Sequence, residues 1–92
     1  MIESDVKRAV KKLLTEIGAY WFMPVPTGYG ARTVDFLVCW RGAFYGIETK
    51  RPGVDQPTPE QALAMSKIVH AGGAACLEND PALPAVRRMF NL

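Results

Sequence analysis

The 92-residue sequence has little of several features that mark familiar classes of protein. It has one histidine and two cysteines, and Cys39 and Cys76 are too far apart for a zinc-type pair. Both cysteines lie in apolar stretches, so we expect reduced thiols in the core. No apolar run approaches a membrane span, and the first residues are unlike a signal peptide. We therefore expect an intracellular protein without a zinc site and without a membrane segment.

The net charge is also small and says little about function. The formal net charge of +2 is too small to indicate nucleic-acid binding by itself, so local clusters must carry any such argument. A hydrophobic content of 49% is enough for one modest core. We expect a single domain over residues 1–92, and help from oligomerisation would suit so small a core.

The most informative feature is a pair of apolar stretches, Thr33–Trp40 and Ala43–Lys50, separated by Arg41-Gly42. If these two residues form the loop of a tight hairpin, Trp40 pairs with Ala43 and the register places Asp35 opposite Glu48. Because side chains alternate along a strand, Lys50 shares the face of Glu48. The sequence thus predicts two carboxylates and a lysine on one face, whereas a three-residue loop would shift the register by one.

Asp35, Glu48 and Lys50 suit a metal-dependent phosphodiesterase. Opposed carboxylates repel, and a proton or a cation relieves the repulsion. Carboxylate oxygens suit Mg²⁺, Mn²⁺ or Ca²⁺, and a nearby lysine orients water or stabilises charge on a phosphate. The alternative is a surface hairpin with a Glu–Lys ion pair. The apolar residues around the three side chains favour the functional interpretation.

A helix is expected over Glu3–Ile17, because apolar residues recur there at helical spacing and Gly18 then ends it. Glu3 falls inside the apolar stripe. Its carboxylate either reaches the edge of the Asp35/Glu48 site and binds a metal there, directly or through water, or only favours the helix dipole, and the pattern leaves both open. The opposite side is basic, and such a face is either solvated or a DNA contact; its cations are Lys7, Arg8, Lys11 and Lys12.

Four further elements complete the order helix, three strands, helix, strand, helix. A strand is predicted at Tyr20–Met23, a helix starting at Thr58, a strand at Ala74–Glu78 and a short helix at Ala82–Phe90. Both faces of the hairpin are largely apolar, so the sequence predicts an α/β fold with a mixed sheet covered on both sides.

Two polar residues of the connecting loop and one of the second helix are further candidates. Tyr29 and Arg32 lie in a Pro- and Gly-rich loop over 24–32, where they suit contact with a DNA strand. Gln61 stands at the capping-box position after Thr58 and near the centre of an apolar stripe that includes Ala62, Met65, Ile68 and Val69. Its amide bonds to its own cap or to a partner in the interior. His70 looks like a surface histidine and is given no chemistry.

The run Val34-Asp35, followed after twelve residues by Glu48-Thr49-Lys50, resembles the PD-(D/E)xK signature of restriction-endonuclease-like nucleases. The wider pattern is similar to that of the virus-type replication-repair nuclease (VRR-NUC) domains. It comprises Glu3 at the first helix, Gly28-Tyr29-Gly30 before the aspartate, Arg51-Pro52-Gly53 after the lysine, and Gln61. Val34 stands where that family usually has proline.

The resemblance implies a restriction-endonuclease-like α/β/α core of about four strands and a DNA endonuclease dependent on Mg²⁺ or Mn²⁺. It implies that Asp35, Glu48 and the backbone carbonyl of Thr49 hold the metal, that Lys50 acts on water or the transition state, and that Glu3 and Gln61 support the centre. Lys7, Lys11, Tyr29, Arg32 and Arg51 are then candidate DNA contacts.

The resemblance also implies cutting of branched, flapped or four-way-junction DNA in replication, repair or recombination, by a short phage-type homodimer in a bacterial or phage-infected cell. We expect Asp35→Ala to lose activity without unfolding. Two alternatives remain open: a catalytically inactive nucleic-acid-binding module of the same fold, and a small interaction protein whose carboxylates only pair with Lys50.

Overall fold

The chain follows the order α-β-β-β-α-β-α in a computed structural model, which describes residues 2–25 and 32–92. This is the order predicted from the sequence. The Gly28–Gly30 segment, with Tyr29, lies outside the described residues. The elements are α1 (Glu3–Glu16), β1 (Tyr20–Phe22), β2 (Phe36–Trp40), β3 (Ala43–Thr49), α2 (Pro59–His70), β4 (Ala74–Glu78) and α3 (Pro84–Phe90).

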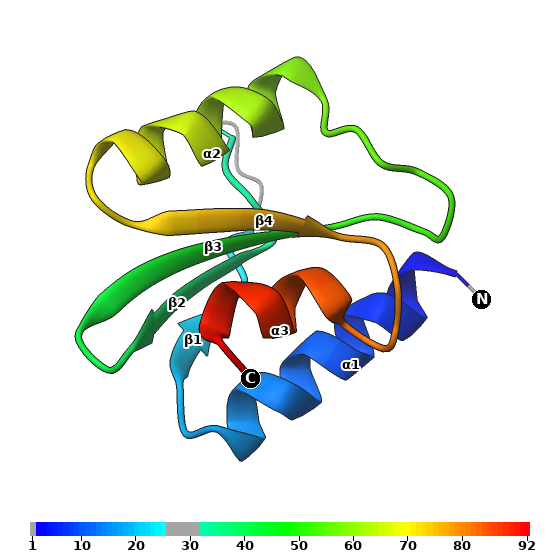
Figure 1. The fold of residues 1–92 in the computed structure, drawn as a ribbon. Coiled ribbons are helices and arrows are strands. Elements are labelled where there is room, and N and C mark those ends of the chain that lie inside the picture. The colour runs from blue at the N-terminus through cyan, green and yellow to red at the C-terminus, as the bar shows by residue number, and fades with distance from the viewer. Residues whose placement is uncertain (1, 26–31) are drawn as a thin grey trace.

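The four strands form one mixed sheet, as expected, and their order in it is β1-β2-β3-β4. β2 is antiparallel to both of its neighbours, β1 and β3, and β4 runs parallel to β3. Parallel neighbours need a crossover connection, and α2 supplies it. Figure 1 shows α1 and α3 on one side of the sheet and α2 on the other. The predicted α/β/α layering is therefore confirmed.

The predicted hairpin register is confirmed. Trp40 pairs with Ala43, and the ladder continues outward to Phe36 and Ile47. The two loop residues, Arg41 and Gly42, have φ values of 51° and 79°. Positive φ at both central positions is what a type I′ hairpin turn requires. The three-residue loop that would have shifted the register does not occur.

The core lies between the sheet and the α1/α3 layer. The expected stripe of α1 supplies Val10, Leu13 and Leu14, and these pack with buried residues of the strands and of α3. Trp40 ties this layer together, because its Nε1–H donates to the carbonyl of Ile17 at 3.0 Å and its ring meets that of Phe90 with centroids 5.2 Å apart. Burying these side chains supplies most of the driving force for folding.

Glu78 fixes the start of α3 against the end of β4. Its side chain is 1% exposed and accepts from the backbone N–H groups of Val86 at 3.0 Å, Asn79 at 3.1 Å and Asp80 at 3.3 Å. The N–H of Val86 lies in the first turn of α3, where intrahelical partners are lacking. Glu78 is thus a structural carboxylate that the sequence pattern did not single out.

Helices lie on both sides of the sheet, as expected, but among the described residues the face under α2 is covered unevenly. The helix packs on β3 and β4, whereas Tyr20 and Phe22 of β1 are 75% and 49% exposed and Phe44 is 45% exposed. With twelve residues, α2 is about 18 Å long, and it crosses only one half of the sheet.

Two burial predictions were wrong. Ala62 and Val69 of α2 are exposed and Ala64 is buried instead. The reason is that the buried face of α2 is rotated from the predicted stripe, and it shares with that stripe only the apolar residues Met65 and Ile68. Cys39 is exposed and Cys76 is half-buried, since Cys39 belongs to the uncovered part of the sheet; both thiols are free, as expected. In the described residues, no helix combines the length and apolar character needed to cross a membrane.

Candidate functional site

Asp35 lies at a bend directly before β2, and its carboxylate is held by Thr49 at the end of β3. Its Oδ2 accepts from the Thr49 N–H at 3.0 Å and from the Thr49 hydroxyl at 2.6 Å. Thr49 is fully buried and Asp35 is 25% exposed. Two donors on one oxygen fix the carboxylate, and within residues 2–25 and 32–92 no hydrogen bond reaches Oδ1.

Glu48 is buried beside Asp35. Its side chain is 1% exposed, Oε1 accepts from the backbone N–H of Asp35 at 3.2 Å, and Oε2 lies 3.7 Å from Lys50 Nζ. Burial, with the Asp35 charge next, raises the pKa of Glu48 to about 7, although Lys50 and the Asp35 N–H lower it. Such a carboxylate gives up its proton near neutral pH, and a cation beside it would favour that loss.

The three predicted residues come together, but not on one strand face. Thr49 and Glu48 are consecutive, so their side chains point to opposite sides of β3, and Asp35 contacts both. The strand pairing ends at Phe36, and the bend at Asp35 frees it from alternation. Asp35 therefore reaches the site from the end of its strand, which the expectation of a continuous strand from Thr33 did not include.

Lys50 is held by backbone as well as by charge. Its N–H donates to the Glu78 carbonyl at 2.9 Å, and its side chain is 16% exposed. An ammonium group on a mostly buried side chain, next to a buried carboxylate, has little freedom to move. Its position in the site is therefore well defined.

The amino-terminal part of α1 also reaches the site. It does so through Lys7, which the sequence pattern placed on the opposite side of the helix. Lys7 Nζ lies 2.9 Å from Glu3 Oε2 and 4.0 Å from Asp35 Oδ2. Desolvation opposes the charge of Lys7, but the hydrogen bond to Glu3 and the charges of Asp35 and Glu48 outweigh it and raise its pKa. Glu3 is therefore linked to Asp35 through Lys7, at the edge of the site.

Lys7 was assigned to the basic side opposite the apolar stripe, and this was wrong. At about 100° per residue, Lys7 lies only about 40° around the helix from Glu3, which the stripe includes. It is half-buried, whereas Arg8, Lys11 and Lys12 are exposed as expected. The helical angle was the signal that could have separated Lys7 from the other cations.

Gln61 is occupied at the start of α2. Its Oε1 accepts from the Thr58 N–H at 2.9 Å, and its own N–H donates to the Thr58 hydroxyl at 3.3 Å. This reciprocal pair is the capping box, one of the two roles that the sequence allowed. The structure places this oxygen at the helix cap.

The donor groups suit an ion such as Mg²⁺, which needs few protein ligands, better than an ion that must be surrounded by protein ligands. Across residues 2–25 and 32–92, no group of three or more His, Cys, Asp or Glu side chains is close enough to hold a metal. Asp35 and Glu48 remain as a close pair of carboxylates. Mg²⁺ is commonly bound through one or two carboxylates and keeps several waters. The pair therefore has the chemistry that such an ion needs.

Of the candidate DNA contacts, Lys11, Arg32 and Arg51 are exposed, and Tyr29 lies outside the described residues. Arg32 and Lys67 both border a cavity of about 500 Å³ beside α2, together with Glu60 and the apolar Leu63 and Ile68. Thr33, which lies two residues before Asp35 in the sequence, also lines this cavity.

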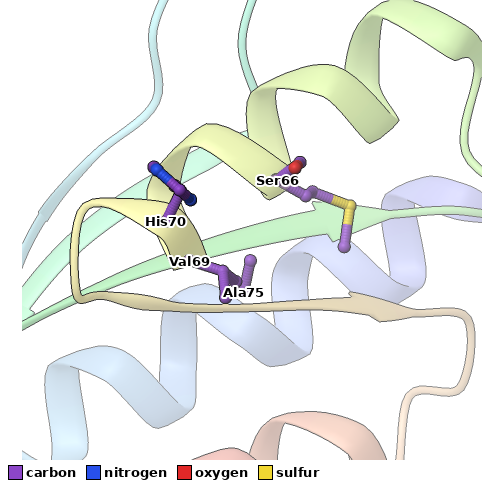
Figure 2. Close-up of a pocket in the computed structure, with 5 residues that line it drawn as sticks. Ser66, Val69, His70 and Ala75 are labelled. Carbon is purple, nitrogen blue, oxygen red and sulfur yellow. The ribbon is translucent and has the colours of Figure 1, made fainter.

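A second cavity, of about 330 Å³, lies between α2 and β4. Figure 2 shows Ser66, Val69 and His70 of α2 beside Ala75 of β4. His70 is exposed, as predicted, and the lining brings no carboxylate to it.

No protein-family model matches the sequence, and no curated protein matches it. Among solved structures, the chain is similar to one described as a "VRR_NUC domain", with a TM-score of 0.77 and 19% sequence identity. The match covers 97% of this chain and 94% of the other. The resemblance read from the sequence is thus confirmed at the level of the fold. This chain has the nuclease-type fold of a VRR_NUC domain.

Proposed function

We propose that the protein is a DNA endonuclease that depends on Mg²⁺ or Mn²⁺. The observation that carries this proposal is the meeting of Asp35, buried Glu48 and Lys50 at one end of the hairpin, with Lys50 Nζ 3.7 Å from Glu48. A carboxylate pair beside an ammonium supplies the ligands and the positive charge that phosphodiester hydrolysis requires.

In this proposal, Asp35 and Glu48 hold the cation, with the backbone carbonyl of Thr49 as a further ligand. The bound cation supplies Lewis-acid stabilisation of phosphate charge and makes an attacking water more acidic. Lys50 orients that water and stabilises the charge that builds on the phosphate. Glu3 acts at the edge of the site through Lys7. Gln61, whose Oε1 caps α2, stays a candidate for supporting the centre.

We further propose branched, flapped or four-way-junction DNA as the substrate, as the resemblance implies. Lys11, Arg32 and Arg51 are exposed cations suited to phosphate contact, and Lys67 beside Arg32 adds a fourth. A two-fold homodimer of a phage-type protein would offer two such sites to a symmetric junction.

The test is cleavage of labelled single-stranded, duplex, flapped and four-way-junction DNA in Mg²⁺, Mn²⁺ or EDTA. Glu48→Gln and Lys50→Ala should each lower the rate by at least about a hundredfold, because each removes a ligand or charge from the transition state. Glu16→Gln, a matched change at an exposed carboxylate, should cut like the parent.

Equal cutting in EDTA and Mg²⁺ would contradict the metal-dependent mechanism. Binding of junction DNA in Mg²⁺ without any cutting would identify the chain as an inactive nucleic-acid-binding module of the same fold. Absence of both DNA binding and divalent-ion binding would leave the carboxylates as a structural ion-pair network with Lys50.

A further inference from the structure

Lys7 differs from the other cations of α1 in what its side chain contacts. Its Nζ lies 2.9 Å from Glu3 and 4.0 Å from Asp35, and the side chain is 30% exposed. Arg8, by contrast, pairs with Asp5 of its own helix at 3.3 Å and is 76% exposed. Lys12 is exposed on the outer side of the helix. Lys7 is thus drawn toward the site, whereas Arg8 and Lys12 of the same helix face solvent.

An ordinary ion pair between residues four apart on a helix explains only half of this arrangement. The Glu3–Lys7 contact is of that kind, and such pairs contribute little to stability. Asp35, however, belongs to a different part of the chain. The oxygen that Lys7 approaches, Oδ2, is the same atom that accepts both hydrogen bonds from Thr49. The ammonium therefore adds a full positive charge to the most densely coordinated carboxylate oxygen of the site.

We propose that Lys7 is the internal counter-cation of the acidic site and competes with a divalent cation for Asp35 and Glu3. This inference rests on the proposed function, since it concerns the same carboxylates. Two cations beside one carboxylate repel each other, so Lys7 must withdraw when a divalent ion binds. The flexible four-carbon stem of lysine allows that withdrawal. The released ammonium stays at the rim of the site, where a DNA phosphate approaches.

The test is titration of the full chain with Mn²⁺ in a calorimeter, without DNA. The variants are Lys7→Met, which keeps the length of the apolar stem, Lys7→Ala, and Lys12→Ala as a control with the same change of net charge. Lys7→Met and Lys7→Ala should bind Mn²⁺ at least about fivefold more tightly than the parent, because a repelling charge near the ion has gone. Lys12→Ala should bind like the parent, because charges at the exposed position are screened.

Thermal melts of all four proteins establish that each is folded during the titration. Mn²⁺ affinity that is unchanged or weaker in both Lys7 variants, relative to Lys12→Ala, would overturn the inference while leaving the metal site in place. Tight Mn²⁺ binding by the Lys7 variants and none by the parent would support it strongly. If neither the parent nor the Lys7 variants bind Mn²⁺, the metal site itself fails, and the proposed function fails with it.

Discussion

Glu48 is a buried carboxylate whose negative charge is only partly balanced by its neighbours. It accepts one backbone hydrogen bond, and its ion pair with Lys50 is 3.7 Å long. Desolvation therefore dominates, and the proton is favoured over the charge until the pH reaches about 7. The buried charge of Glu48 therefore costs stability, and carboxylates with so perturbed a pKa are common at functional sites.

This balance predicts how stability depends on pH when metal is removed. The pKa of Glu48 is raised from 4.5 to about 7 on folding, so the folded state binds this proton more tightly than the unfolded state. The stabilisation is fully present below pH 4.5 and is lost as pH rises through about 7. As the pH rises from below 4.5 to above about 7, the free energy of unfolding falls by roughly 3 kcal/mol because of this one group.

Urea unfolding in EDTA, measured from pH 5 to 8, checks this dependence. The free energy of unfolding of the parent should fall across the range more steeply than that of Glu48→Gln, which carries no titrating group at this position. Parallel curves for the two proteins would show that Glu48 titrates in the folded chain as it does in the unfolded one.

Asp35 has a structural task besides its proposed chemical one. Because Thr49 is fully buried and both of its donors bond to Asp35, Asp35→Ala leaves two donors without a partner. The expected cost is about 1–3 kcal/mol. Asp35→Asn keeps an acceptor at the same place and should lose less stability, while losing the charge that a cation needs.

The comparison is made by urea unfolding and by DNA cleavage of the two variants side by side. Asp35→Asn should separate the loss of activity from the loss of stability. The sequence-based expectation that Asp35→Ala leaves the fold unharmed then holds only if the chain has stability to spare. Equal stability of Asp35→Ala and the parent would show that water satisfies Thr49.

At the scale of the element, the hairpin could be predicted because its turn is encoded locally. Arg41-Gly42 between two apolar stretches leaves few loop geometries, and the register follows by counting. The bend at Asp35 could not be predicted, since it depends on Thr49, which is fourteen residues later and bonds to Asp35 only once β2 and β3 are paired. Cys39 was misplaced for a similar reason, because its burial depends on where the helices lie over the sheet. Lys7 was misplaced although its helical angle puts it close to Glu3, so local spacing did carry that signal.

The packing of α2 on the sheet depends on Gly46 of β3. A Cβ built there would lie 2.5 Å from Ile68 Cδ1 and 3.1 Å from Val34 Cγ2. Gly46→Ala should therefore destabilise the protein, by about 1–3 kcal/mol, through overpacking. Ile68→Val removes the colliding methyl group and by itself should cost about 0.5–1.5 kcal/mol.

A double-mutant cycle tests this contact. If the contact is as close as described, the double variant Gly46→Ala/Ile68→Val should be more stable than the sum of the single effects allows. Strict additivity in urea unfolding would mean that α2 shifts to accept the alanine. Gly73→Ala is a harsher companion, because its new Cβ would lie 2.8 Å from the backbone oxygen of Phe44.

At the scale of the whole molecule, the uncovered half of the sheet is the natural place for a partner chain. Tyr20 and Phe22 lie on an edge strand and Phe44 lies on the same face of the sheet, and all three are substantially exposed. Exposed aromatic residues on a sheet edge mark interaction surfaces. The proposed homodimer should therefore use this surface.

Light scattering after size exclusion should give a dimer for the parent at micromolar concentration and a monomer for Tyr20→Lys/Phe22→Lys. Both positions are exposed in the single chain, so the substitutions should leave the monomer folded. Val25→Lys, at another exposed apolar residue beyond the end of β1, is the matched control. A monomeric parent would contradict the homodimer, and a dimeric double variant would place the interface elsewhere.

The hairpin also bears on how much of the sequence the arrangement of the site needs. Asp35, Glu48, Thr49 and Lys50 position one another largely through their own backbone and side-chain atoms, within the stretch 35–50. Much of the remaining chain has only to present this stretch on a sheet of the right shape, and many sequences can do that. An identity of 19% beside a TM-score of 0.77 shows that this fold is compatible with very different sequences. Chains with such a hairpin are better sought by a short pattern on a matching backbone than by resemblance summed over the whole chain.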